Sequence, residues 1–293
     1  MSIATDCMLV NLHRGAWEAR KLDKEKSREV AADSGAAPDA VNVNKLIIPK
    51  EAMSKVNAAS GAVYNHYILH TLPWKDNGDR LLSRKVYMKF IAEHEGLVHL
   101  LNAEADNFAF TVYPGYRAQA QFRMAGLFRV NDYPDPTEVR AKFYARMEID
   151  AVTEASDFRV KVDAEQSQRI QAQIEANLNA RVGEVMNKVW GQLSKALEHY
   201  AERMRADGRL YDSVRDNLID LCDILPGLNI LNDPNLAKLG KEIKARLAGY
   251  DVKMLRDPKV GKVLKEQAAT QADEIIEQMR GFMTAFGVAD AAE

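Results

Sequence analysis

The feature that most constrains this fold is a long amphipathic segment in the second half of the chain, residues 163–206. Its apolar residues recur at spacings of three and four without a break, which is the pattern of one amphipathic helix. Asp163 is a suitable N-cap and Gln166 occupies the third helical position, which is a capping-box arrangement. Asp207-Gly208 follows the last apolar residue and is a typical helix stop. We therefore predict one helix of about 43 residues and roughly 65 Å, a spine against which other helices or other subunits pack.

Two glycines lie within this predicted helix, Gly183 and Gly191. Each costs about 1 kcal/mol relative to Ala in an exposed helix, so close packing by another helix, or a bend, is expected there. The predicted helix-packing or oligomer contact comprises Val182, Gly183, Met186, Trp190 and Gly191. The whole apolar stripe consists of Ile170, Ile174, Leu178, Val182, Val185, Met186, Val189, Leu193, Leu197, Tyr200 and Met204.

The composition is that of an ordinary globular protein. The 293 residues are 47% apolar and 28% charged, with a formal net charge of -2. Such a balance provides no bulk electrostatic drive toward nucleic acid or an anionic membrane. Cys7 and Cys222 lie far apart and outside any CxxC pattern, so we expect two reduced, mostly buried thiols. No signal peptide and no apolar run long enough to span a bilayer is apparent, so we expect a cytoplasmic protein.

The first part of the chain mixes strand and helix patterns. Strand-like stretches occur at residues 7–13, 143–152 and 158–163, which predicts a small antiparallel sheet of about three strands. Residues 143–163 are expected to form a hairpin that runs directly into the spine helix. Asn77-Gly78 is the dipeptide typical of a tight hairpin turn, with a compact turn as the alternative. Further helices are predicted over the following ranges: 50–70, 83–113 and 116–128.

The second part of the chain is predicted to be entirely helical. Beyond the spine, helices are expected at residues 210–225, 234–248 and 258–286, the first stopped by Pro226-Gly227. Short loops allow these helices to fold back on the spine as a bundle. The fold class is therefore α+β, predominantly helical. We expect an α+β part over residues 1–162 and a helical part over 163–293, which the continuous spine helix can join into one unit.

The motifs of common chemistry are absent or incomplete. His66 and His70 are four residues apart, but a catalytic zinc helix needs Glu after the first His, and this segment reads HYILH. Structural or surface histidines are therefore the preferred interpretation. The calcium-loop resemblance of Asp76-Asn77-Gly78-Asp79 fails because Arg84 stands where a Glu ligand is required. No phosphate-binding or dinucleotide-binding glycine pattern occurs. We predict no catalytic residues, no metal site and no cofactor.

Aromatic residues and arginines alternate between residues 74 and 159. Bases stack on aromatic faces while arginines neutralise phosphates, so this composition is compatible with a single-strand nucleic-acid surface. The other interpretation is that the aromatics belong to the core and the arginines pair with acidic residues, which the near-zero net charge favours. The candidate nucleic-acid or partner surface comprises Trp74, Arg80, Tyr113, Arg117, Arg123, Arg129, Tyr133 and Arg159.

Three stretches together resemble a known group of proteins: TLPWKDNGDRLL, GLFRVNDYP with EVRAKF, and SDFRVKVD before a long helix. The chain is similar over residues 6–230 to an uncharacterised family, a domain of unknown function found in tailed-phage and plasmid genomes. Its genes often lie near those of a MoxR-type AAA ATPase and a von Willebrand A protein. The resemblance implies a phage or mobile-element protein in the host cytoplasm, with the ATPase as a candidate partner. It assigns no role to any residue.

Two functions are expected from these observations. The first is a non-enzymatic, oligomerising scaffold or adaptor, supported by the long spine helix and the amphipathic helices after it. The alternative is a single-stranded DNA-binding or annealing protein, since phage annealing proteins also have a small sheet that leads into a long helix. That likeness concerns the order of elements alone, and a fold does not fix a function. An enzyme with an unrecognised site is a third hypothesis, which no motif supports.

Overall fold

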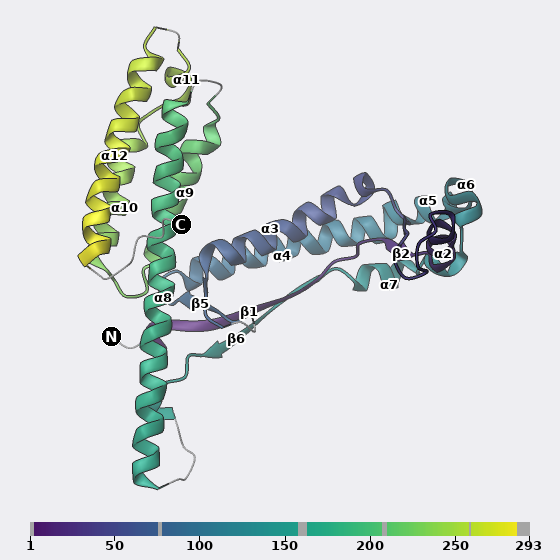
Figure 1. The fold of residues 1–293 in the computed structure, drawn as a ribbon, viewed down its shortest axis with the longest axis horizontal. Helices are drawn as coiled ribbons and strands as arrows, with labels where there is room; N and C mark the ends of the chain where they lie inside the picture. The colour runs from purple at the N-terminus through teal and green to yellow at the C-terminus, as the bar shows by residue number, and fades with distance from the viewer. Residues whose placement is uncertain (1–2, 76–77, 158–162, 207–209, 258, 286–293) are drawn as a thin grey trace. The chain divides into compact units, whose positions relative to one another are not determined.

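A computed structural model describes residues 3–75, 78–157, 163–206, 210–257 and 259–285. The fold is α+β and mainly helical, with a small antiparallel sheet, one long helix and further helices after it (Figure 1). This confirms the predicted fold class. None of the helices in the described residues combines the length and the apolarity that a bilayer crossing needs.

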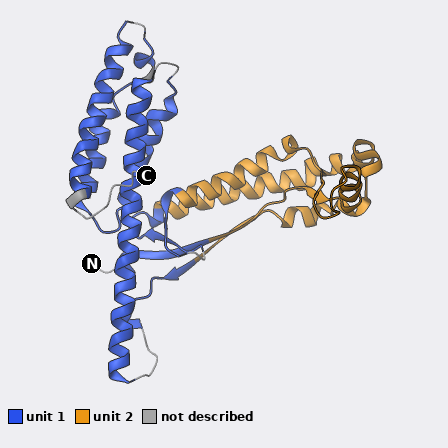
Figure 2. Ribbon diagram, viewed as in Figure 1, with its two compact units in different colours: residues 1–11, 69–88, 149–293 blue, residues 12–68, 89–148 orange. Residues whose placement is uncertain are grey.

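The chain folds into two compact units, each of which has its own hydrophobic core (Figure 2). Unit 1 comprises residues 1–11, 69–88 and 149–293, and unit 2 comprises residues 12–68 and 89–148. This division differs from the predicted parts, 1–162 and 163–293, because the chain enters and leaves unit 1 more than once. Two of the boundaries between the units fall inside uninterrupted helices, close to one end of each helix. These helices are α3 (Ser54–His70) and α4 (Tyr87–Asn107).

The main sheet has four strands in the order β4-β5-β1-β6, one more than predicted. Antiparallel pairing joins β1 to β5 and β5 to β4, with Cys7 opposite Ser83 and Leu72 opposite Leu81. The Asn77-Gly78 dipeptide lies between β4 and β5, and Gly78 adopts a positive φ of 98°, as the hairpin prediction requires. The predicted strand at residues 158–163 falls almost entirely outside the described residues. The strands are β1 (Cys7–Gly15), β4 (Leu72–Pro73), β5 (Arg80–Ser83) and β6 (Tyr144–Ala151).

Unit 2 is built around α3 and α4, which pack along each other, since His66 of α3 stacks on Phe90 of α4 with ring centroids 4.9 Å apart. A second, two-stranded sheet pairs Arg20 with Leu46. The predicted helix over 116–128 is broken, because Ala125 adopts a positive φ of 44° after a short helix. The other elements of unit 2 are β2 (Arg20–Leu22), α2 (Lys24–Asp33), β3 (Asn44–Leu46), a π-helical segment (Phe108–Val112), α5 (Tyr113–Ala118), α6 (Ala120–Met124) and α7 (Pro136–Ala141).

A buried lysine ties together three segments of unit 2. The Lys45 side chain is 7% exposed and its Nζ lies 2.6 Å from Asp132 Oδ2 and 3.5 Å from Asp23 Oδ2. The same ammonium donates to the carbonyl of Leu127 at 3.1 Å. Because a buried ammonium needs both charge and hydrogen-bond partners, this cluster fixes β3 against the chain after α6.

The long helix of unit 1, α8 (Ala164–Arg205), matches the predicted spine closely. Asp163 is its N-cap and accepts from Gln166 N at 2.8 Å. Helices α9, α10 and α12 form a bundle with the second half of α8, and α12 lies along α8 (Figure 1). The predicted stop before Pro226 is wrong, because α9 continues through that proline to Leu228. The remaining elements of unit 1 are α1 (Ile3–Asp6), α9 (Asp212–Leu228), α10 (Pro234–Leu247), α11 (Val252–Leu255) and α12 (Gly261–Ala285).

Candidate functional site

The aromatic members of the predicted nucleic-acid surface are core side chains. Trp74, Tyr113 and Tyr133 are 8%, 0% and 5% exposed. The Tyr113 hydroxyl donates to the carbonyl of Pro134 at 2.7 Å, and burial raises the pKa of this phenol to about 12. Trp74 belongs to unit 1, whereas the two tyrosines belong to unit 2. Their apolar faces pack inside the two cores, so a base-stacking surface built on these three rings is not present in the folded chain.

The arginines of the predicted surface have structural partners. Arg80 donates from Nε to Thr71 Oγ1 at 2.7 Å and from a terminal nitrogen to Thr71 O at 2.6 Å. Arg123 donates to the main-chain carbonyls of Leu46 and Ile47. These guanidiniums therefore fasten strand ends and loops.

Two further arginines of that surface have carboxylate neighbours. Arg129 lies 3.2 Å from Glu25, and Arg117 lies 3.7 Å from Asp135. Both pairs are exposed, and such pairs contribute little to stability. Arg159, the last member of the set, lies outside the described residues. The structure thus brings only part of the predicted residues to the surface of unit 2.

The predicted helix-packing residues of α8 divide into two groups. Val182, Met186 and Trp190 are buried in the core of unit 1, so residues of the same chain cover them. Gly183 and Gly191 do not mark a close approach, since a Cβ at either position would meet nothing within 4 Å. Among the described residues, no element therefore packs closely against these two glycines. The helix runs without interruption through both of them.

The first part of α8, residues 164–181, has no buried side chain, in contrast to the second part, residues 182–205. Ile170, Ile174 and Leu178 continue the apolar stripe into this first part and are half-buried. The segment amounts to about five turns of helix. Leu178 packs against the core of unit 1, whereas Ile170 and Ile174 extend the stripe beyond that core.

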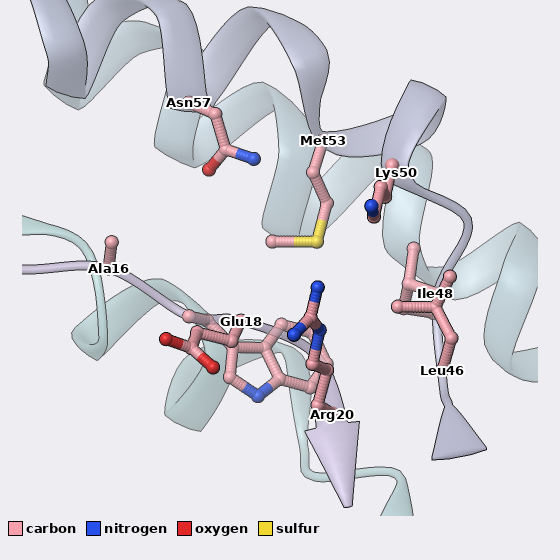
Figure 3. Close-up of a pocket in the computed structure, with 9 residues that line it drawn as sticks. Ala16, Glu18, Arg20, Leu46, Ile48, Lys50, Met53 and Asn57 are labelled. Carbon is pink, nitrogen blue, oxygen red and sulfur yellow. The ribbon is translucent and has the colours of Figure 1, made fainter. Parts of the chain in front are cut away.

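Unit 2 contains an open pocket beside β2 and β3, with a volume of about 330 Å³. Its lining combines Trp17 with two cationic side chains, Arg20 and Lys50, and one carboxylate, Glu18. In Figure 3 the Arg20 guanidinium and the Lys50 ammonium point toward the same space beside Met53, whereas the Glu18 carboxylate points away. This arrangement suits a small anion with an apolar part. The pocket cannot be recognised in the sequence, because its residues come from separate segments and form no motif.

The two cysteines are unsuited to nucleophilic chemistry. Cys7 and Cys222 are both free and buried, as the sequence predicts. Burial is the largest cause of a raised pKa at each thiol, to about 11 for Cys7 and about 12 for Cys222. Because the thiolate is the nucleophile, both side chains are inert near neutral pH.

Comparisons of this chain with protein-family models, with curated proteins and with solved structures find no match.

Proposed function

We propose that this protein is a non-enzymatic scaffold that self-associates through the first part of α8, residues 164–181. The observation that carries the proposal is the difference in burial between the two parts of α8. One apolar stripe lies in the core of unit 1 from Val182 onward and is only partly buried at Ile170, Ile174 and Leu178. A partly buried apolar stripe on a stable helix is a surface suited to another helix.

A second copy of the chain fits this stripe well. Ile170, Ile174 and Leu178 are spaced evenly, about 6 Å apart along the helix axis. An antiparallel copy with its two-fold axis at Ile174 would bring Ile170 against the partner's Leu178 at both ends of the contact. Such isologous pairing is the commonest form of self-association.

The charges of the segment do not oppose self-association. Its ionisable side chains are Glu165, Arg169, Glu175 and Arg181, two acidic and two basic. Because they sum to zero, two copies meet no single-sign repulsion. Ile174 does not belong to the core of unit 1, whereas Leu178 packs against that core, so a substitution at Ile174 spares the core residues of α8 from Val182 onward.

The test compares the wild-type protein with Ile174→Glu by size-exclusion chromatography and light scattering at micromolar concentration. We expect a defined oligomer for the wild type and a monomer for Ile174→Glu, because the new carboxylates would be desolvated at the contact. The matched control is Ala176→Glu, which adds the same side chain at an exposed position of α8, about 200° away around the helix. It should remain oligomeric.

Two results would remove the proposal. A wild-type protein that is monomeric at micromolar concentration excludes self-association, and equal effects of both substitutions would exclude the stripe as the contact. Circular dichroism of each variant checks that the helices are intact. Single-stranded DNA binding and an ATPase partner stay predictions, which an oligonucleotide titration at two salt concentrations and a co-purification with the ATPase would test.

A further inference from the structure

The open pocket beside β2 and β3 combines an apolar wall with two cationic side chains (Figure 3). Its wall includes Trp17, Ile48 and Met53, of which Ile48 is 0% exposed and Met53 is 2% exposed. Because buried side chains are held by their neighbours, this wall exists before any ligand arrives. Arg20 and Lys50 point into the space beside it. The residues of the lining all belong to unit 2, so the pocket is complete within one unit.

The two cationic side chains of the pocket have no counter-charge within the described residues. Neither Arg20 nor Lys50 forms an ion pair there, and both are exposed. A guanidinium and an ammonium can only donate hydrogen bonds. Two such donors that point toward the same space repel each other, and an anion between them would be stabilised by both.

The backbone at Ala19 turns a nearby carboxylate away from this space. In a regular strand, residues two apart share a face, which would place Glu18 on the side opposite to Ala19 and each side chain in alternation with the next. Ala19 instead adopts a positive φ of 50°, and the Glu18 carboxylate points away from the Arg20 guanidinium (Figure 3). Such a φ is strained in a residue other than glycine. It is maintained here because Ala19 is fully buried and its carbonyl accepts from Ile47 N at 2.8 Å. Strain of this kind is frequent at ligand-binding sites.

We propose that this pocket binds a small aromatic carboxylate. The ring would pack against Trp17 and Met53, since an indole and a thioether both make favourable contacts with aromatic rings. The two carboxylate oxygens would accept from Arg20 and Lys50, and a planar guanidinium suits a carboxylate in particular. A cavity of about 150 Å³ holds a benzene molecule. The pocket volume of about 330 Å³ therefore has room for one or two rings with a carboxylate.

The main chain around the pocket favours a carboxylate over a phosphate. Phosphate sites commonly use free backbone N–H groups at helix starts or in glycine-rich loops. Beside this pocket the Ile47 N–H donates to the carbonyl of Ala19, and Pro49 has no N–H. No glycine occurs among the described residues that line it. Side chains rather than the main chain would therefore hold the anion.

The experiment titrates the full-length protein with 2-naphthoate by calorimetry and follows the indole N–H signals by NMR. The chain has three tryptophans, of which Trp17 lines the pocket, whereas Trp74 and Trp190 are buried in the core of unit 1. We expect saturable binding with a dissociation constant below about 1 mM at low salt. Binding should shift the Trp17 signal and leave the other two unchanged. The affinity should fall as salt is raised, because both cations are exposed.

Two further probes separate the charge of the ligand from its ring. The neutral 2-naphthamide keeps the shape of 2-naphthoate and removes its charge, so it should bind at least about ten-fold more weakly. Inorganic phosphate has charge without a ring and should not displace 2-naphthoate at equal concentration.

Two variants test the cationic residues directly. Arg20→Met and Lys50→Met should each weaken 2-naphthoate binding at least about ten-fold, because each removes a charged hydrogen-bond donor. Circular dichroism should show an unchanged fold, since both side chains are exposed and outside any ion pair of the described residues. The matched controls are Lys21→Met on β2 and Lys55→Met on α3, which are exposed and do not line the pocket. Both should bind like the wild type.

Four results would overturn the proposal. The first is the absence of saturable 2-naphthoate binding up to about 1 mM, and the second is binding that leaves the Trp17 signal unchanged. The third is an equal affinity for 2-naphthamide or displacement by inorganic phosphate at equal concentration. The fourth is a loss of affinity in Lys21→Met and Lys55→Met as large as in the two pocket variants.

Discussion

Replacement of Lys45 by Met is the sharpest test of what holds unit 2 together. The substitution keeps most of the side-chain volume and removes the ammonium that lies 2.6 Å from Asp132 Oδ2. Asp23 keeps another partner, because its carboxylate caps α2 and accepts from Lys26 N at 3.1 Å. Asp132 has no other ion pair among the described residues, and its side chain is only 12% exposed. The variant therefore leaves one buried carboxylate without compensation.

The magnitude follows from the distance and the burial. At 2.6 Å and an effective dielectric constant of about 20, the Lys45–Asp132 attraction is about 6 kcal/mol. Desolvation of the two ions offsets several kcal/mol of this, so the pair itself is close to neutral compared with apolar side chains. Removal of one partner is different, because the other charge keeps its desolvation cost. We expect Lys45→Met to lower the free energy of unfolding by about 3–5 kcal/mol.

The assay is urea unfolding followed by circular dichroism, with two further variants. Lys45→Met/Asp132→Leu removes both charges and should recover most of the lost stability. Arg129→Met breaks an exposed pair with Glu25, whose side chains are 54% and 70% exposed, and should cost less than about 1 kcal/mol. Equal losses for Lys45→Met and Arg129→Met would refute the reasoning, as would a double variant less stable than either single one.

Two further predictions each compare two residues of the same type. Tyr200 has a buried hydroxyl with no hydrogen-bond partner among the described residues, so Tyr200→Phe should leave the free energy of unfolding unchanged or raise it by about 1 kcal/mol. Tyr113→Phe deletes a 2.7 Å hydrogen bond and should lower that free energy by about 1 kcal/mol in chemical unfolding. A Cβ at Gly261 would lie 2.5 Å from the carbonyl oxygen of Leu255, so Gly261→Ala should lower the melting temperature. A Cβ at Gly249 meets nothing within 4 Å, so Gly249→Ala should leave the melting temperature unchanged. The opposite order within either pair would contradict the packing described.

The elements that the sequence predicts best are those set by local chemistry. The start of α8 follows from the capping preference of Asp163, and the start of α10 follows from Asp233 followed by proline. The β4–β5 hairpin follows from the positive φ that Gly78 adopts without cost. Each of these signals depends on a few neighbouring residues, so a single sequence is enough to find it.

The sequence could not show that Trp74, Tyr113 and Tyr133 of the candidate nucleic-acid surface are buried, because tertiary packing decides their exposure. An aromatic residue among arginines has the same local pattern whether the ring packs in a core or lies on a surface. Tyr113 is fully buried, whereas Phe122 on the neighbouring helix α6 is 94% exposed. Nothing in the spacing of these residues separates the two outcomes, because Tyr113 is covered in part by residues distant in the sequence, such as Trp17, whose ring centroid lies 5.6 Å away.

The apolar stripe of α8 could be predicted from the spacing of its residues, but the elements that cover it could not. The spacing of threes and fours predicted one continuous stripe, and the helix has it. Periodicity does not identify the element that covers each part of the stripe. An apolar helix face has the same pattern whether its partner belongs to the same chain or to another chain. In unit 1 the fully buried part of the stripe begins at Val182, and Ile170, Ile174 and Leu178 are only partly buried. Because partly buried apolar side chains gain free energy when a partner covers them, this first part of α8 is where we propose that the chain self-associates.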